Sequence, residues 1–415
     1  MKKIAEELFR EREKRVNDAI ALKKPDRVPI LAYFGFFPAT YKGITIEESM
    51  YDQNKMMEAW TSTITEFAPD MVENPYGSRH LGPLLEALDC KHLKWPRHGL
   101  DEDLPFQYVE GEYMKANEYD AFLFDMSDYL VRTYWPRVFG ALESFKDLPP
   151  LNEMISYHFG ALNFSGFDSP EVVRSLEAMV RAGTQARRVR DCARDYAEEM
   201  KRQGFPSMYG AMTHVPFDAL SDFFRGTTGA MLDMYREPKK LLEAIDQLLP
   251  IMIRVGVNGA RRTGVPRVFI PLHKGQEGFM SIDQFKTFYW PGFRQLMLSL
   301  IEEGLTPCPF VEGDYTSRLE FLADVPAETV CYHFESTDMF KAKEVLGEKA
   351  CIRGNVSLSL LATGTPEEVT TYCKKLIDVA GQGGGFIMDA ATVLDDAKLE
   401  NVKAMFDFTK DYGVY

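Results

Sequence analysis

Side chains that can transfer protons or bind metal ions close a series of short apolar runs in the second half of the chain. The runs SMYGAMTHV, RVFIPLH, TPCPFVEGD, CYHFES, CIRGNVS and GGFIMDA end, in order, with Thr213 and His214, His273, Glu312 and Asp314, His333 and Glu335, Asn355, and Asp389. Histidine and carboxylate groups do acid–base chemistry near neutral pH, and both are common zinc ligands. A single polar residue at the end of one run means little, so the indication of function comes from the recurrence of such residues at the ends of consecutive runs.

The alternation of strand side chains predicts which of these residues meet. Successive side chains point to opposite faces, so Glu312 and Asp314 share one face of their strand, and His333 and Glu335 share one face of theirs. If both faces point inward, Glu312 and His333 can form an open zinc site of the catalytic kind, with His273 as the predicted third ligand. The alternatives are, for His333, a buried, hydrogen-bonded histidine or a plain acid–base residue, and, for Glu312, a solvated loop carboxylate or a helix N-cap.

The elements that carry these residues alternate between short apolar segments and helical ones from about residue 206 onward. This alternation indicates βαβ units and a parallel sheet, and right-handed crossovers close such units into a (β/α)₈ TIM barrel. In that fold the active site lies at the carboxyl ends of the strands. A doubly wound open sheet is the alternative, but no GxGxxG motif follows the first strand.

The 415 residues exceed the roughly 250 of a plain barrel, so insertions are expected. Residues 1–24 form a predicted N-terminal helical extension, and the run 28–33 is a predicted buried strand. The region of about 70–205 lacks the alternation of short apolar and helical segments that begins near residue 206, and it is predicted to be an inserted cap on a single barrel domain.

Composition narrows the class of protein. The net charge of −14 argues against non-specific binding to nucleic acid or to an anionic membrane. The charged N-terminus does not have the pattern of a signal peptide, and no apolar run reaches about 18 residues, so a cytoplasmic protein is expected. Six cysteines without a CxxC pair predict free thiols.

An aromatic run follows the predicted first strand: Tyr33, Phe34, Phe36 and Phe37. Core packing is the plainest interpretation of such a run. The alternative is that these rings form a wall against which an aromatic substrate packs.

Several motifs in the second half resemble a known superfamily. GQEGFMSIDQFKTFYWPGF is similar to its glutamine, serine and aromatic-proline run, IRGNVSLSLLATGTPEEV to its Gly-Asn strand end, and GGGFIMDAATVLDDAKLENVKAMFDFTKDYG to its last strand and helix. KKPDRVPI, near the N-terminus, resembles its first strand. The chain thus resembles the uroporphyrinogen decarboxylase-like superfamily over most of its length, which implies the same barrel.

The branch of the superfamily is indicated by departures from its motifs. Decarboxylases carry Arg-Gln-Ala-Gly-Arg-Tyr after the first strand, whereas residues 36–41 here read FFPATY, without an arginine. Corrinoid-linked methyltransferases that act on thiols carry His-x-Cys-Gly and a later cysteine. The matching places here hold residues 310–313, FVEG, and Ala390-Ala391, so Glu312 stands where the first cysteine would be.

A zinc ion with oxygen and nitrogen ligands is a stronger Lewis acid toward an oxygen than one with thiolates. The resemblance therefore implies a demethylase of methoxylated aromatic compounds that uses Zn²⁺, held by Glu312 and His333, and that passes the methyl group to a corrinoid (cobalamin) on a partner protein. The superfamily's upstream glutamate falls on Met297. Polar residues with expected roles are Asp314, Glu335 and Asp389 as catalytic groups, and His214 and Asn355, with the aromatic run, as substrate-binding groups.

Three other functions stay open. The first is a metal-independent decarboxylase of a small cyclic or tetrapyrrole-like acid, for which Arg225, Arg267 and Arg353 could bind carboxylates. The second is a barrel that only binds a ligand or partner. The third is a methyltransferase for methanol or a methylamine.

Overall fold

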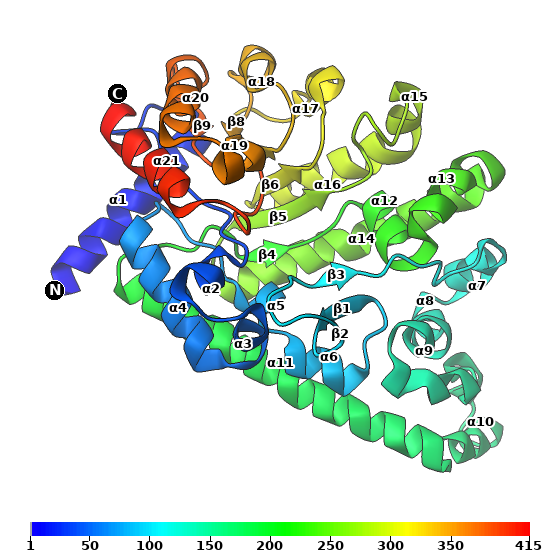
Figure 1. The fold of residues 1–415 in the computed structure, drawn as a ribbon. Helices are drawn as coiled ribbons and strands as arrows, with labels where there is room; N and C mark the ends of the chain where they lie inside the picture. The colour runs from blue at the N-terminus through cyan, green and yellow to red at the C-terminus, as the bar shows by residue number, and fades with distance from the viewer. Residues whose placement is uncertain (1) are drawn as a thin grey trace.

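A six-stranded parallel sheet forms most of the barrel wall. The computed structural model describes residues 2–415, and the strands follow one another in the order of the chain. They are β4 (Ala211–Met212), β5 (Arg267–Leu272), β6 (Thr306–Val311), β7 (Cys331–Phe334), β8 (Cys351–Arg353) and β9 (Phe386–Ile387). Figure 1 shows these strands surrounded by the helices that connect them.

Two short segments near the N-terminus complete the ring. Ile30 pairs in parallel with Met388, directly after β9, and the backbone N–H of Asp70 donates to the carbonyl of Ile30 at 2.9 Å. Val72 in turn pairs in parallel with Ser207, shortly before β4. Eight parallel segments therefore close on themselves, and the predicted (β/α)₈ barrel is confirmed.

Helices follow each segment of the wall, as the crossovers of a parallel sheet require. The first segment is followed by α2 (Phe37–Lys42), α3 (Ile46–Tyr51) and α4 (Gln53–Phe67), and β4 is followed by α12 (Pro216–Ala219), η6 (Leu220–Arg225), α13 (Gly226–Arg236) and α14 (Pro238–Thr263). Strand β5 is followed by α15 (Ile282–Gln284), η7 (Phe285–Tyr289) and α16 (Trp290–Glu302). The later strands are followed by η8 (Thr316–Arg318) and α17 (Leu319–Leu322) after β6, α18 (Met339–Leu346) after β7, α19 (Leu358–Thr363) and α20 (Pro366–Val379) after β8, and α21 (Leu399–Tyr412) after β9.

Local sequence explains where these helices start. Thr365 caps α20 in a capping box with Glu368, and Pro366 occupies the first turn. Ser281 and Gln284 form the same kind of box at the start of α15. These starts agree with the alternation of apolar and helical segments predicted from about residue 206 onward.

The amino end of the barrel is filled by α1 (Lys2–Ile20). Its buried residues pack against inward-facing side chains of the wall, and the cluster comprises Val16, Ala19, Ile20, Leu31, Met71, Met208, Cys308, Cys331, Cys351 and Ile387. All six cysteines are free thiols, as predicted. Because Cys308 and Cys331 point inward, Glu312 and His333 also lie on inward faces.

The region between the second and third wall segments forms a cap on one side of the molecule (Figure 1). It contains α5 (Tyr76–Arg79), α6 (Gly82–Leu88), the small sheet of β1 (Leu93–Pro96), β2 (Gly99–Leu100) and β3 (Gln107–Tyr108), η1 (Ala116–Glu118), α7 (Tyr119–Phe124), α8 (Met126–Tyr129), η2 (Leu130–Tyr134), α9 (Trp135–Val138), η3 (Gly140–Asp147), η4 (Leu151–Ile155), α10 (Phe159–Leu162), η5 (Asn163–Asp168) and the long α11 (Pro170–Arg202).

The start of this region belongs to the wall. Residues 70–72, placed at the beginning of the predicted insertion of about 70–205, are the second segment of the barrel. The stretch is too short to show strand periodicity in the sequence, and it is recognised only by its pairing. None of the helices within residues 2–415 is long and apolar enough to cross a membrane.

Candidate active site

An imidazole between two carboxylates lies at the carboxyl end of the barrel. His273 directly follows β5, and its Nδ1 lies 2.5 Å from Oδ2 of Asp222, which belongs to η6. Its Nε2 lies 3.6 Å from Oε1 of Glu312, which directly follows β6. Three separate parts of the barrel thus bring one base and two acids together.

A buried aspartate fixes the loop that carries this histidine. Asp218 in α12 is fully buried and accepts hydrogen bonds from the backbone N–H groups of His273 and Lys274, both at 3.0 Å. It also accepts the hydroxyl proton of Tyr289 at 2.6 Å. Lys274 places its Nζ 3.4 Å from Asp222. The loop after β5 is therefore tied to the helix after β4, which orients the imidazole.

The surroundings shift the pKa values of this group of residues. Burial lowers the pKa of His273, but the hydrogen bond to Asp222 and the charges of Asp218 and Glu312 outweigh it and raise that pKa to about 9. Burial raises the pKa of Glu312 to about 7, although His273 opposes the shift. At neutral pH the His273 ring is therefore protonated, and the neighbouring Glu312 carboxyl group is partly protonated.

The predicted partner His333 lies deeper in the barrel. It pairs in register with Phe310, and the two rings are 4.8 Å apart, so Glu312 lies one layer nearer the mouth. Nε2 of His333 is 2.8 Å from the carbonyl oxygen of Ala390, to which it donates. Burial, assisted by Arg353, holds the pKa of His333 well below its ordinary value, so this ring is neutral. The structure brings Glu312 to His273, with His333 beneath them.

The residues at the mouth of the barrel supply only part of a zinc site. A catalytic zinc site has three protein ligands, and His273 with Glu312 would supply two. Within residues 2–415 no group of three histidine, cysteine or carboxylate side chains is arranged to hold a metal ion. Met297 is buried in α16, with its sulfur 3.6 Å from the hydroxyl of Tyr332. As placed, these residues fit proton transfer better than a three-ligand zinc site, and the zinc ion stays a prediction.

The three carboxylates predicted to be catalytic all have structural partners. Glu335 accepts the backbone N–H of Gly313 at 2.6 Å and so holds the turn beside Glu312. Asp314 accepts from the backbone and hydroxyl of Thr316. Asp389 forms a buried ion pair with Arg353. These contacts orient the mouth of the barrel and leave His273 and Glu312 as the groups most open to chemistry.

The two polar residues predicted to bind substrate differ in their surroundings. The side-chain amide of Asn355 donates to the carbonyls of Glu335 and Thr337 and accepts from Tyr372, so its hydrogen-bonding capacity is used within the protein. His214 packs edge-on against Phe223. Burial and the charge of His273 lower the pKa of His214 to about 4, which keeps the ring neutral.

The aromatic run divides between the barrel interior and the core. Tyr33 points into the barrel, with its ring 5.6 Å from Phe310 and 6.1 Å from Phe269. These three rings form an aromatic floor around the site. Phe34 and Phe37 instead pack in the core, with partners that include Phe67, Phe406 and Tyr41. Phe36 lies against Phe106 of the cap.

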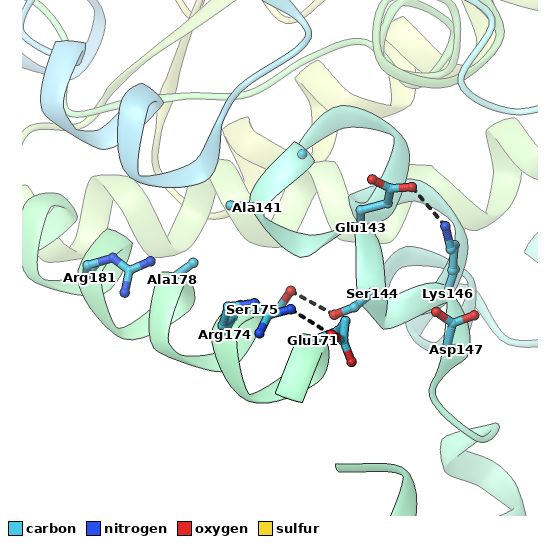
Figure 2. A pocket seen from close by; sticks show the side chains of 11 residues that line it. Ala141, Glu143, Ser144, Lys146, Asp147, Glu171, Arg174, Ser175, Ala178 and Arg181 are labelled. Atoms are coloured by element: carbon cyan, nitrogen blue, oxygen red, sulfur yellow. Dashed lines mark hydrogen bonds and ion pairs between the residues drawn. The ribbon is translucent and has the colours of Figure 1, made fainter. Parts of the chain in front are cut away.

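Sequence reasoning missed Asp218 and Asp222. They are four residues apart directly after β4, a spacing that places two side chains on one face of a helix. That spacing, next to a strand end, was the available signal. A surface groove between α11 and η3 holds no predicted site residue; Figure 2 shows that Glu143 pairs there with Lys146, Glu171 with Arg174, and Ser144 with Ser175.

The fold and the sequence were compared with known proteins. A methyltransferase from Methanosarcina mazei matches with a TM-score of 0.63 and 16% identity, covering 97% of this chain and 98% of that one. At this identity the likeness shows the fold. Uroporphyrinogen decarboxylases from Chlorobaculum tepidum and Chlorobium phaeobacteroides are 24% identical over 197 residues and 23% over 193, each match covering 44% of this chain and 52% of the relative.

The chain therefore spans about half the length of the curated relatives it matches. The family model for uroporphyrinogen decarboxylase (URO-D) matches residues 170–412, which carry six of the eight wall segments of the ring, β4 to β9, and the helices from α11 to α21. Since this match covers more than half of the sequence, the protein belongs to the URO-D family.

Proposed function

We propose that this protein is a methyltransferase that removes the methyl group of a small aromatic methyl ether and passes it to a corrinoid carried by a partner protein. The observation that carries the proposal is the protonated His273 held between Asp222 and Glu312 above an aromatic floor. The likeness of the fold to a methyltransferase supports it.

The chemistry needs a proton donor at the leaving oxygen. When a nucleophile attacks the methyl carbon, the carbon–oxygen bond breaks and its electron pair stays on the oxygen. An unassisted phenolate leaves poorly, and a phenol has a pKa of about 10. A donor with a pKa of about 9 is closely matched to this oxygen. His273 would transfer its Nε2 proton there as the bond breaks.

The neighbouring groups complete this cycle. Asp222 keeps the other ring nitrogen protonated and fixes the ring orientation. Glu312, with a pKa of about 7, can exchange protons with solvent and return one to His273. The side chains of His273 and Glu312 remain 30% and 36% exposed, so both can be reached by substrate.

Decarboxylation is the second candidate, and membership of the URO-D family favours it. Its predicted carboxylate-binding arginines are already occupied. Arg225 pairs with Asp233, Arg353 pairs with Asp389, and Arg267 donates to backbone carbonyls. The two functions differ in product, since one releases a phenol and the other releases carbon dioxide.

The test uses reduced cobalamin as the methyl acceptor and a panel of methoxybenzenes, methanol and methylamines. We expect methylcobalamin, followed by its absorption spectrum, together with free phenol, from the methoxybenzenes only. His273→Gln should abolish both signals, whereas His158→Gln, which alters an exposed histidine, should not. Methylcobalamin from only the non-aromatic donors, or full activity of His273→Gln, would contradict the proposal.

A further inference from the structure

We infer that Arg79 binds a carboxylate on the substrate, so that the molecules accepted are methoxylated aromatic acids and not neutral methoxybenzenes. The methoxy part of this inference rests on the proposed function. The carboxylate part rests on the surroundings of Arg79 alone.

Arg79 is the last residue of α5, a short helix that follows the second wall segment. Its guanidinium carbon lies 5.5 Å from the ring centre of Tyr33 and 5.6 Å from that of Phe36. Tyr33 belongs to the aromatic floor of the site, with Phe269 and Phe310. The guanidinium therefore lies at the edge of that floor, where a bound aromatic ring would end.

The hydrogen-bonding capacity of this arginine is largely unused. Its side chain donates to the hydroxyl of the adjacent Ser78. Its Nε is buried and has no partner. In the part of the chain that the structure describes, no ion pair includes Arg79, whereas the buried Arg353 and Arg225 both have carboxylate partners. An arginine offers five donors in a planar fork that matches a carboxylate, so Arg79 is suited to an anion that comes from outside.

The carboxylates that feel its charge are held by other groups. Glu73 lies 3.6 Å from Arg353, and burial raises its pKa to about 7. Asp395 accepts the backbone N–H of Phe36, and burial raises its pKa as well. Neither carboxyl group forms an ion pair with Arg79 in the part of the chain that the structure describes, so the guanidinium has no fixed anionic partner.

Tyr33 connects Arg79 with the acid–base group through its ring contacts. The guanidinium lies beside this ring, and the ring centre is 5.6 Å from that of Phe310, two residues before Glu312 on the same inward face of the wall. Arg79 and Glu312 therefore border the same aromatic floor, which an aromatic acid could span.

The test measures binding without methyl transfer, by calorimetry with 4-methoxybenzoate and its neutral analogue 4-methoxybenzamide. A charged hydrogen bond of this kind favours the acid by on the order of tenfold or more. Arg79→Gln should remove that preference, and Arg79→Lys should keep part of it. Arg97→Gln is the matched control, because Arg97 is an exposed arginine of the cap paired with Glu47.

Equal affinity of the unaltered protein for acid and amide, absence of binding of the acid, or an unchanged preference in Arg79→Gln would overturn the inference. Thermal unfolding of each variant confirms that it is folded. 4-Hydroxybenzoate, which has no methyl group, separates the two proposals. If it binds in an Arg79-dependent way while no methoxylated acid gives methylcobalamin, the carboxylate site stands and the proposed function fails.

Discussion

The strongest test of the acid–base assignment is the substitution Asp222→Asn. The hydrogen bond to Asp222 is the main influence that raises the pKa of His273, and burial works in the opposite direction. Without Asp222, only the charges of Asp218 and Glu312 oppose the effect of burial, so the pKa of His273 should fall from about 9 toward its ordinary 6.5. The amide keeps the size of the side chain, so the change is mainly electrostatic.

The size of the effect follows from the fraction of His273 that holds a proton. At pH 8, a group with a pKa of about 9 is about nine-tenths protonated, whereas one with a pKa of about 6.5 is about 3% protonated. If the protonated imidazole is the donor, methyl transfer at pH 8 should fall about thirtyfold. The loss should become much smaller below pH 6, where both forms of the enzyme are protonated.

The assay is the pH dependence of kcat/KM, together with NMR titration of the His273 ring. The alkaline limb should move from about pH 9 toward pH 6.5 in Asp222→Asn. Asp283→Asn, which alters an exposed carboxylate in α15, is the control and should leave the limb in place. A limb that does not move, or a loss that is equal at every pH, would refute the reasoning.

Three further predictions concern stability and metal content. Asp389→Asn breaks a fully buried ion pair with Arg353 and should lower the free energy of unfolding by about 3–5 kcal/mol, measured by urea denaturation; a loss below about 1 kcal/mol would contradict this. Because the pKa of His273 is raised and that of Asp222 is lowered, their pairing should stabilise the fold fully between about pH 4 and 6.5. That stabilisation should vanish as the pH rises through about 9, so the difference in unfolding free energy between the unaltered protein and Asp222→Asn should shrink there to the part that Lys274 contributes. The zinc hypothesis from the sequence is tested by metal analysis: about one ion per chain that is lost in Glu312→Ala and in His333→Ala would favour it over the proton-donor role of His273, and protein that is fully active without metal would remove it.

Much of the fold could be predicted from the sequence because its second half repeats a strong local signal. The apolar runs that end in His273, Glu312 and His333 are strands β5, β6 and β7, and their alternation correctly gave the inward faces. The wall segment at residues 70–72 could not be found this way. It is too short for any periodicity, and its strand character comes from partners far away in the chain.

The details of the site depend on how far each residue lies along the barrel axis, and the in–out alternation of strand side chains does not give that position. Glu312 and His333 face the same interior, but the register pairs His333 with Phe310, one layer below Glu312. The neighbour of Glu312 is instead His273, whose loop is positioned by Asp218. Arg79 lies in a region without a strand–helix pattern, so only the folded chain shows that it lies beside Tyr33.

The helix that fills the amino end of the barrel has a kinetic consequence. With α1 packed beneath the inward-facing cysteines, the amino end of the interior is closed, and His273 and Glu312 lie at the other end. Under the proposed function, the donor molecule and the acceptor protein would therefore use the same entrance. We expect a compulsory order, in which the ether enters first, the acceptor docks over it, and the demethylated product waits until the acceptor has left.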